Sequence, residues 1–241
     1  MDSPSSISES LDWIAVSKPS GWVTHRSHWD RNSKALLQWV RDQQQGKHVH
    51  AVHRLDRSTS GTVLFAKNPI AAKRLMEEFE SRSAQKCYFA LVRGFLKESI
   101  VINSPLRVIN NDESKGDYVE ALTEVSLLAK GILQEPLGEF ESQRISFLKL
   151  SPKTGRTHQL RRHTAKISHP IIGDTKYGDR HINRLWRSLG LTRLALHAYS
   201  LETLETGLLK SPLPRDMIDA CLKIQWLDEG LETILKYSVD S

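Results

Sequence analysis

The chain has 241 residues, enough for one large domain or two small ones with a core that needs no disulfides or metals. Its formal charge of +6 suits a nucleic-acid partner, and equally an ordinary basic soluble protein. There is no signal-peptide pattern or membrane-length apolar run, and Cys87 and Cys221 match no metal spacing. We therefore expect a cytoplasmic protein without a membrane partner, in which residues 1–10 are a disordered lead and residues 11–241 form a single domain.

Apolar patterning predicts the first elements of the chain. A strand is expected over residues 11–16, followed by a turn at Lys18-Pro19-Ser20-Gly21. Residues 33–40 have helical spacing, with Ser33 as the expected cap. Residues 48–52 alternate between polar and apolar side chains, which predicts a strand.

A buried strand and a second helix are expected next. The apolar run after Gly61 predicts the strand. Asn68 is then a suitable helix cap, with Pro69 at the first helical position. The apolar stripe of this helix is expected to contain Ala72, Leu75, Met76 and Phe79.

The second half of the chain mixes strands and helices without regular βαβ alternation. That mixture favours an α+β fold over a doubly wound sheet. Glycine and proline mark loops over residues 103–118 and 130–142. The expected strands cover residues 88–92, 121–128, 144–150 and 194–201, and the expected helices cover residues 157–167 and the tail from Pro212.

Asp56 lies between Arg54 and Arg57, and a turn containing Thr59 follows it before Gly61. Positive neighbours favour the ionised form of a carboxyl group over the protonated form. An ionised aspartate suits nucleophilic attack or charge stabilisation better than proton donation. The arginines suggest that the substrate is an anion.

A second basic segment covers residues 151–163. It has a glycine turn, a threonine that can cap a helix, and then arginine and histidine over two turns. A helix N-terminus with extra cations can hold a phosphate or a carboxylate. Unless it has a partner such as Asp56, a solvated basic face with Leu160 packed inward is the better interpretation.

Other cations and aromatic residues lie between these segments. Together they are the ingredients of RNA binding by phosphate contact and base stacking, although several aromatic residues are expected in the core. The cations are Lys18, Arg26, Arg31, Arg57, Lys67, Lys73, Arg74, Arg82, Lys86 and Arg93, and the aromatic residues are Trp22, Trp29, Trp39, Tyr88 and Phe89.

The sequence lacks the characteristic motifs of several enzyme classes. There is no P-loop, no G-x-G-x-x-G after a strand, no H-E-x-x-H and no G-x-S-x-G. Two histidine groups are therefore expected to be surface or hydrogen-bonded residues rather than metal ligands. These are His48, His50 and His53, and His158 and His163. No second carboxylate neighbours Asp56, which disfavours a glycosidase.

The motif at residues 53–61 resembles the H-R-L-D-x-x-T-S-G motif of the RluA-type pseudouridine synthases. Other family motifs are matched in the same order across residues 11–201. They are Lys18-Pro19-Ser20-Gly21, the strand of residues 86–94, the T-G-R-x-H-Q-L-R segment of residues 154–161, His169-Pro170-Ile171-Ile172-Gly173-Asp174 with Tyr177-Gly178, and Leu196-His197-Ala198.

This resemblance implies a pseudouridine synthase fold, with a mixed, mostly antiparallel central sheet, flanking helices and a basic RNA-binding cleft. It implies isomerisation of a uridine within structured RNA, without a cofactor. The target base must leave its stack before it can react. By the same resemblance, Asp56 is the catalytic carboxylate, Arg54 fills the vacated space, Tyr88 packs on the uracil, and Arg161 pairs with Asp56. Further RNA contacts are expected from Arg57, Thr59, Arg156, His158, Gln159 and Arg162.

Within the family, the chain is most similar to members that modify uridine 65 of tRNA. The details that favour this substrate are His25-Arg26-Ser27 with Asp30-Arg31, the pair Arg161-Arg162, and the polar residues of 174–184. Members that modify ribosomal RNA share most of them. Residues 202–207 stand where the family has an H-P-x-x-G turn after Leu201. The resemblance to the family therefore covers the last forty residues or so poorly.

Three alternatives differ in substrate or chemistry. The first is a ribosomal RNA synthase of the same family. The second is a non-catalytic RNA-binding protein, which would not need Asp56, Tyr88 and Arg161 together. The third is a glycosidase that releases free base, which would need a water-activating partner. We expect a monomer without an obligate protein partner.

Overall fold

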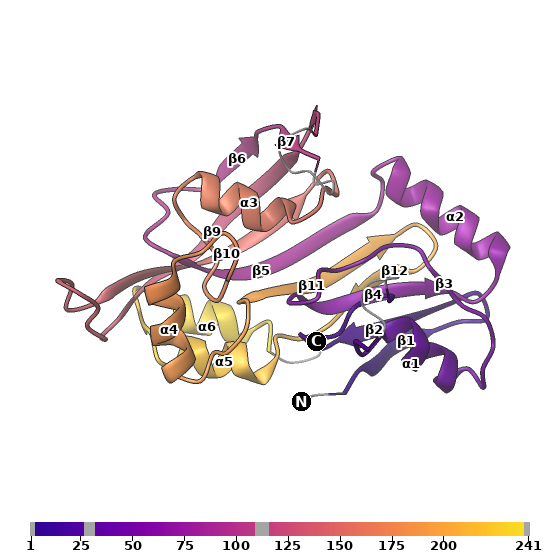
Figure 1. Cartoon of the computed structure of the whole chain (residues 1–241), viewed down its shortest axis with the longest axis horizontal. Helices are drawn as coiled ribbons and strands as arrows, with labels where there is room; N and C mark the ends of the chain where they lie inside the picture. Colours follow the sequence, from indigo (N-terminus) through magenta and orange to yellow (C-terminus); the bar gives the residue numbers. More distant parts are fainter. Residues whose placement is uncertain (1–2, 27–31, 109–115, 239–241) are drawn as a thin grey trace. The chain divides into compact units, whose positions relative to one another are not determined.

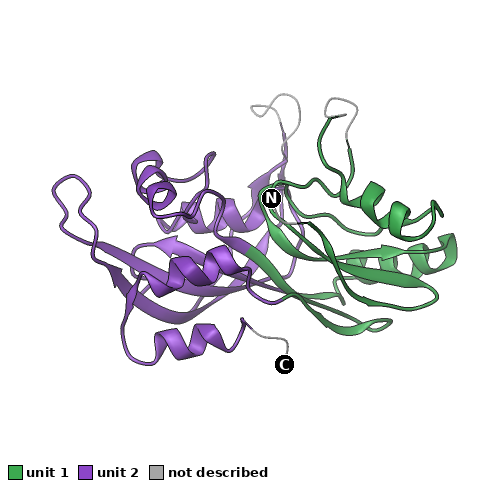
Figure 2. Cartoon of the chain, turned by 90° about the horizontal axis from the view of Figure 1, so that it is seen from below, with its two compact units in different colours: residues 1–86, 197–211 green, residues 87–196, 212–241 purple. Residues whose placement is uncertain are grey.

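The computed structural model describes residues 3–26, 32–108 and 116–238. Trp29, Asp30 and Arg31 lie outside the described residues, as does Ser27. The contacts divide the chain into two compact units, residues 1–86 with 197–211 and residues 87–196 with 212–241 (Figure 2). That residues 11–241 act as a single catalytic domain stays a prediction.

Unit 1 contains a sheet in the order β1-β2-β4-β11, in which β3 also pairs with β4 and β12 with β11. Its strands are β1 (Ser5–Glu9), β2 (Trp13–Lys18), β3 (His50–Ala51), β4 (Ser60–Ala66), β11 (Leu196–Thr203) and β12 (Gly207–Lys210). The pairing of β4 with β11 is parallel, and the others are antiparallel. Every residue of β4 is buried, which confirms the predicted buried strand.

The unit's helices are α1 (Leu36–Gln43) and α2 (Pro69–Glu80). Asn68 caps α2 as predicted, because its side-chain oxygen accepts the Ala71 N–H at 2.8 Å. Ala72 and Leu75 are buried, whereas Met76 is 39% exposed and lies at the edge of the stripe.

The cap predicted for α1 is wrong. The residue before the helix is Ala35, and no side chain caps it. Instead, the N–H groups of Leu36 and Leu37 donate to the carbonyls of Val23 and Thr24 at 2.9 and 3.0 Å. A neighbouring backbone segment therefore satisfies the first donors of α1, and the Ser33 hydroxyl is not needed for that purpose.

Residues 5–9 are not a disordered lead, contrary to the prediction. They form the edge strand β1, which pairs with β2 from Ser5 to Glu9 with an irregularity between Ser6 and Ser8. The segment is polar, and only the Ile7 side chain packs against the core. Backbone hydrogen bonds hold such an edge strand, so hydrophobic patterning does not reveal it.

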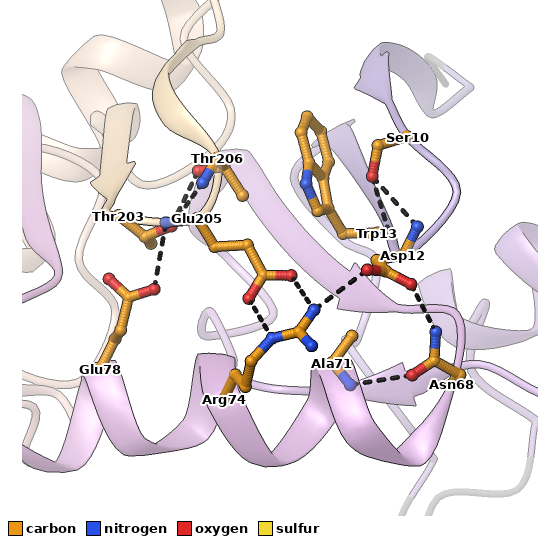
Figure 3. A network of polar contacts seen from close by, with 10 residues as sticks. All are labelled: Ser10, Asp12, Trp13, Asn68, Ala71, Arg74, Glu78, Thr203, Glu205 and Thr206. Atoms are coloured by element: carbon orange, nitrogen blue, oxygen red, sulfur yellow. Dashed lines mark hydrogen bonds and ion pairs between the residues drawn. The ribbon is translucent and has the colours of Figure 1, made fainter.

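The divergent residues 202–207 contain the end of β11, the turn of residues 204–206 and the start of β12, and a polar network joins this turn to α2 (Figure 3). Both carboxylate oxygens of Glu205 accept from the Arg74 guanidinium, at 2.8 and 2.9 Å. Arg74 also donates to Asp12 at 3.0 Å, and Glu78 accepts the Leu204 N–H at 2.6 Å. Arg74, one of the cations expected for RNA binding, is thus already paired within unit 1.

Unit 2 contains a sheet in the order β5-β10-β9-β13, with β6 paired to β9, and a separate pair β7-β8. Its strands are β5 (Gln85–Arg93), β6 (Ile100–Asn103), β7 (Leu106–Arg107), β8 (Tyr118–Val119), β9 (Leu122–Leu133), β10 (Gln143–Pro152) and β13 (Gln225–Trp226). Its helices are α3 (Gln159–Lys166), α4 (Arg180–Ser188), α5 (Arg215–Leu222) and α6 (Gly230–Leu235), all labelled in Figure 1. The described pairings are antiparallel.

The structure of unit 2 differs from the sequence predictions in two loops, in one additional helix and in the tail. The loop expected over 130–142 begins later, because β9 continues to Leu133 and Gly131 pairs with both Ile145 and Trp226. The loop expected over 103–118 includes the short strands β7 and β8. The helix α4 was not predicted. The tail is helical as expected, but β13 separates α5 from α6.

Helices accompany mainly antiparallel strands in both units, which confirms the predicted α+β class. No helix in the described ranges is long and apolar enough to cross a membrane.

Candidate active site

Asp56 lies in the loop between β3 and β4 of unit 1 and is half-buried. The N–H of Thr59 donates to the Asp56 carbonyl at 3.1 Å, which closes a tight turn that begins at Asp56. On the other side, the Leu55 N–H donates to the Thr24 hydroxyl at 3.1 Å. Hydrogen bonds on both sides of Asp56 therefore fix the backbone of the loop at this residue.

Lys18 joins this loop to the turn that follows β2. Its side chain is fully buried, and its ammonium donates to the carbonyls of Trp22, Pro19 and Arg57 at 2.8, 3.1 and 3.3 Å. The Gly21 N–H also donates to the Arg57 carbonyl, at 2.8 Å. The sequence analysis predicts Lys18 among the cations available for RNA binding. Its burial corrects this, because the ammonium positions the loop next to Asp56.

Gly61 follows the loop where β4 runs beside β11, with Ala198 as its partner in register. Its φ is +118°, and a Cβ atom there would lie 2.2 Å from the Ala198 carbonyl oxygen. Only glycine fits both the conformation and the space. Next to it, the buried Ser60 hydroxyl hydrogen-bonds His197 Nδ1 at 2.9 Å, and His197 Nε2 donates to the Ser211 carbonyl at 2.8 Å.

The other predicted residues of this loop differ in exposure. Arg54 and Arg57 are exposed, and Arg57 Nε donates to the Gly21 carbonyl at 3.2 Å. Thr59 is only 2% exposed. Its direct contact with RNA stays a prediction, and its burial favours a structural role instead.

His53 is the first residue of the motif, and two contacts of its ring hold this end of the motif in place. Its ring stacks on Phe79, with the ring centres 4.7 Å apart, and Nε2 accepts the Leu64 N–H at 2.9 Å. The pKa of His53 is lowered to about 3, chiefly because burial desolvates the imidazolium and also because Lys86 repels its charge. The neutral imidazole therefore links the start of the motif to β4.

Tyr88, on β5 of unit 2, is half-buried and faces Leu150 of β10 in register. The strand context predicted from the sequence is confirmed. Its packing on a uracil stays a prediction.

The first turn of α3 is built around Gln159. Its side-chain oxygen accepts the Thr154 hydroxyl and the Arg156 N–H at 2.7 and 3.0 Å, and its amide nitrogen donates to the Leu122 carbonyl and the Thr123 hydroxyl, both at 3.0 Å. With 4% exposure, this amide fixes the glycine turn instead of facing solvent. As for Thr59, burial disfavours direct contact between Gln159 and RNA.

His158 occupies the cap position of α3 with a left-handed φ of 55°, and no side chain provides the expected cap. This conformation is uncommon for a residue with a Cβ atom. Nδ1 of His158 hydrogen-bonds the Tyr177 hydroxyl at 3.1 Å. The strained backbone thus places the imidazole against Tyr177.

Arg161 and Asp174 form a buried bidentate ion pair. Nε and Nη2 of Arg161 each donate to one Asp174 oxygen at 2.8 Å, and the two side chains are 8% and 1% exposed. Burial alone would raise the pKa of Asp174. The guanidinium and the N–H groups of Tyr177 and Lys176 outweigh burial, so the pKa lies below its usual value.

Other contacts fix this pair in orientation. The Tyr177 ring lies over the guanidinium, with 5.2 Å between the ring centre and Arg161 Cζ. Asn183 of α4 donates to the Asp174 carbonyl at 2.7 Å and accepts the Gly173 N–H at 2.8 Å. The sequence predictions omitted Asp174, Tyr177 and Asn183 as site residues. The family motif at residues 169–178 contains Asp174 and Tyr177, whereas Asn183 lies beyond it.

The remaining basic residues of this segment have separate partners. Arg156 is exposed, and its Nε donates to the Glu120 carbonyl at 3.0 Å. Arg162 donates to the Arg107 carbonyl at 2.9 Å. His163 is fully buried between the Thr123 hydroxyl and the Ser104 carbonyl, at 2.9 and 3.0 Å, which confirms a hydrogen-bonded histidine.

The predicted site residues thus fall into two groups. Unit 1 brings together Arg54, Asp56, Arg57 and Thr59, and unit 2 holds Tyr88 and the basic segment of α3. The predicted pairing of Asp56 with Arg161 would join the units and stays a prediction. Within the described ranges, no group of histidine, cysteine or acidic residues could hold a metal ion.

Known proteins resemble this chain over most of its length. A family model described as RNA pseudouridylate synthase matches residues 12–166. The tRNA pseudouridine synthase C of Pasteurella multocida is 41% identical over 225 residues, which cover 89% of this chain and 90% of that protein. The protein of the same name from Salmonella typhimurium is 42% identical over 198 residues, covering 78% and 75%.

A solved structure shows the same similarity. Human RNA pseudouridylate synthase domain containing 1 superposes with a TM-score of 0.72 at 26% identity, covering 97% of this chain and 94% of that one. The motif residues of both groups lie within or next to the region matched by the family model. The chain belongs to the RNA pseudouridylate synthase family and is an RNA pseudouridine synthase, an isomerase.

Proposed function

We propose that this enzyme converts uridine 65 of tRNA into pseudouridine. The observation that carries the proposal is the identity of about 41% over most of the chain to proteins named tRNA pseudouridine synthase C. A substrate is carried over more safely at this identity and coverage than at the 26% shared with the human structure. The choice of uridine 65 rests on the resemblance described above.

In the proposed reaction, the bond between uracil N1 and ribose C1′ breaks, the base turns, and C5 bonds to C1′. The C5 proton leaves, N1 gains a proton, and no redox step is needed. Asp56 acts as the ionised carboxylate, by attack or by charge stabilisation. The hydrogen bonds on either side of it support this role, because they fix the backbone position from which the carboxylate reaches the substrate.

The uridine must leave its stack to reach Asp56, at a cost of a few kcal/mol. Arg54 is exposed on the same loop, and its planar guanidinium suits stacking and hydrogen bonding in the vacated space. Tyr88 packs on the extruded uracil and takes up the C5 proton.

Arg161 pairs with Asp56 in the reacting complex and keeps it charged. Asp174 supports this role, because its bidentate contact orients the guanidinium plane before substrate binds. Asp174 is therefore a positioning residue, and Arg161 is the residue that acts on the site.

Chemical mapping of unmodified tRNA tests the proposed substrate. The purified protein is incubated with an in vitro transcribed tRNA and separately with ribosomal RNA, and carbodiimide-reactive uridines are mapped. We expect one new pseudouridine, at position 65 of the tRNA, and an unchanged RNA mass. Modification of ribosomal RNA alone would contradict the substrate, and loss of uracil mass would contradict the isomerisation.

A further inference from the structure

Helix α4 carries a face made of arginines. Arg180, Arg184 and Arg187 are exposed and follow the spacing i, i+4, i+7, so they share one side of the helix. The rise of an α-helix spreads them over about 10 Å along its axis. We call these three residues the α4 basic face.

The acidic groups at both ends of α4 are paired with other residues. Asp179 caps the helix and accepts from Arg93 at 2.9 Å. Near the other end, Asp216 pairs with Arg193 at 2.6 Å and Asp219 with Arg215 at 2.8 Å. No ion pair joins Arg184 or Arg187 to another residue in the described ranges, so their charges are not neutralised within that part of the chain.

The opposite face of α4 anchors the helix to unit 2. Trp186 is fully buried and Ile182 is 2% exposed. Asn183 binds the Gly173 N–H and the Asp174 carbonyl, directly next to the carboxylate that holds Arg161. The basic face is therefore fixed relative to the Arg161–Asp174 pair.

We propose that the α4 basic face binds the phosphate backbone of the substrate RNA. The proposal rests on the proposed tRNA substrate. Charge complementarity carries it: a rigid row of un-neutralised arginines suits a regularly spaced polyanion, and guanidinium groups pair well with phosphate. Because such contacts release counterions, they add to affinity without reading sequence.

Two matched double variants test the proposal. Arg184→Gln with Arg187→Gln removes two charges from the basic face, and Lys223→Gln with Lys236→Gln removes two exposed charges from the ends of α5 and α6 in the same unit. Binding of an in vitro transcribed tRNA is measured by fluorescence anisotropy over a series of KCl concentrations. Circular dichroism checks that each variant is folded.

We expect the arginine variant to raise the Kd about tenfold and to reduce the log–log salt slope by about 1.5. Its loss of kcat/KM is expected mainly in KM. The lysine control is expected to change the Kd by less than about twofold. Equal weakening by both variants would show a net-charge effect only and overturn the proposal, as would an unchanged arginine variant.

Product mapping on the same proteins separates this proposal from the proposed function. If the arginine variant binds weakly but still forms pseudouridine at position 65 at high tRNA concentration, both proposals stand. If the wild type binds tRNA through α4 but modifies no tRNA uridine, the tRNA function fails and the binding surface stands.

Discussion

At the residue scale, the Arg161–Asp174 pair shows how a buried charge is kept ionised. A buried carboxylate without partners would become protonated, whereas Asp174 accepts from Arg161 and from two backbone N–H groups. The pair therefore depends on both partners, and removing one leaves the other charge buried.

Replacing Asp174 with Asn should expose that dependence. We expect Asp174→Asn to lower the free energy of unfolding by about 3–5 kcal/mol, because the Arg161 charge stays buried without its partner. Asp219→Asn breaks an exposed pair with Arg215 and should cost less than about 1 kcal/mol. Urea unfolding of both variants measures the difference, and equal losses would refute a special role for burial.

His53 makes stability depend on pH. Its pKa is about 3 in the folded chain against 6.5 ordinarily, so the unfolded chain binds the proton more readily between these values. The contribution of neutral His53 is complete above pH 6.5 and is lost as the pH falls towards 3. His53→Gln keeps an acceptor for the Leu64 N–H but does not titrate.

Unfolding of wild type and His53→Gln at pH 7.5 and 5 checks this. We expect the wild-type advantage to shrink by up to about 2 kcal/mol at the lower pH, since one proton gives about 1.4 kcal/mol per pH unit. An advantage that stays constant or grows towards pH 5 would show that His53 is not held neutral.

At the scale of elements, the Asp56 loop depends on the turn after β2 and on the close approach of β4 and β11. Lys18 and Gly21 bind the Arg57 carbonyl, and Gly61 allows contact with Ala198. These contacts come from three separate stretches of the chain. The loop geometry is therefore a product of the sheet and not of the motif alone.

Gly61→Ala should disturb that geometry more than Gly21→Ala. Both glycines have positive φ, +118° and +88°, but an added Cβ meets the Ala198 carbonyl at Gly61 and open space at Gly21. We expect a cost of about 1–2 kcal/mol at Gly21 from backbone strain alone and a larger cost at Gly61. Thermal unfolding measures both, and similar shifts in Tm would contradict the steric argument.

The sequence predicted the elements whose signals are local. Asn68 and Pro69 mark the start of α2, and the unbroken apolar run marks β4. It missed β1, whose polar strand relies on pairing with β2. It also missed α4, whose exposed side carries Arg180, Arg184 and Arg187 and whose Asn183 contacts Gly173 and Asp174 only in the folded unit.

The sequence motifs name Asp56, Arg54 and Arg161 as candidate site residues, and their roles stay predictions. The motifs do not predict the contacts that hold these residues in place. These motifs do not reveal that Lys18 is buried next to the loop or that Asp174 binds Arg161. Each of these contacts joins residues that are separated along the sequence and meet only in the folded unit. Hydrogen bonds of this kind follow from the fold and leave no local pattern.

At the scale of the whole molecule, the formal charge of +6 belongs to a protein that acts on a polyanion. Net charge favours encounter with RNA, and we expect the clustered cations to decide where the RNA binds. Several cations are committed to ion pairs within the described chain, such as Arg74 and Arg93. The affinity for RNA should therefore depend on a limited number of phosphate contacts.

The salt dependence of tRNA binding counts those contacts. With about four phosphate contacts, the Kd should rise on the order of a hundredfold between 50 and 200 mM salt. Anisotropy titrations of wild-type protein measure the slope. A flat response would contradict phosphate-driven binding.

Tritium release from C5-labelled tRNA tests most directly whether Asp56 is the carboxylate of an isomerisation. Asp56→Asn is compared with Asp42→Asn, an exposed position on α1, and tRNA binding is measured for both. We predict that Asp56→Asn binds tRNA but releases no tritium, whereas Asp42→Asn releases it at the wild-type rate. Sustained turnover by Asp56→Asn would contradict the account.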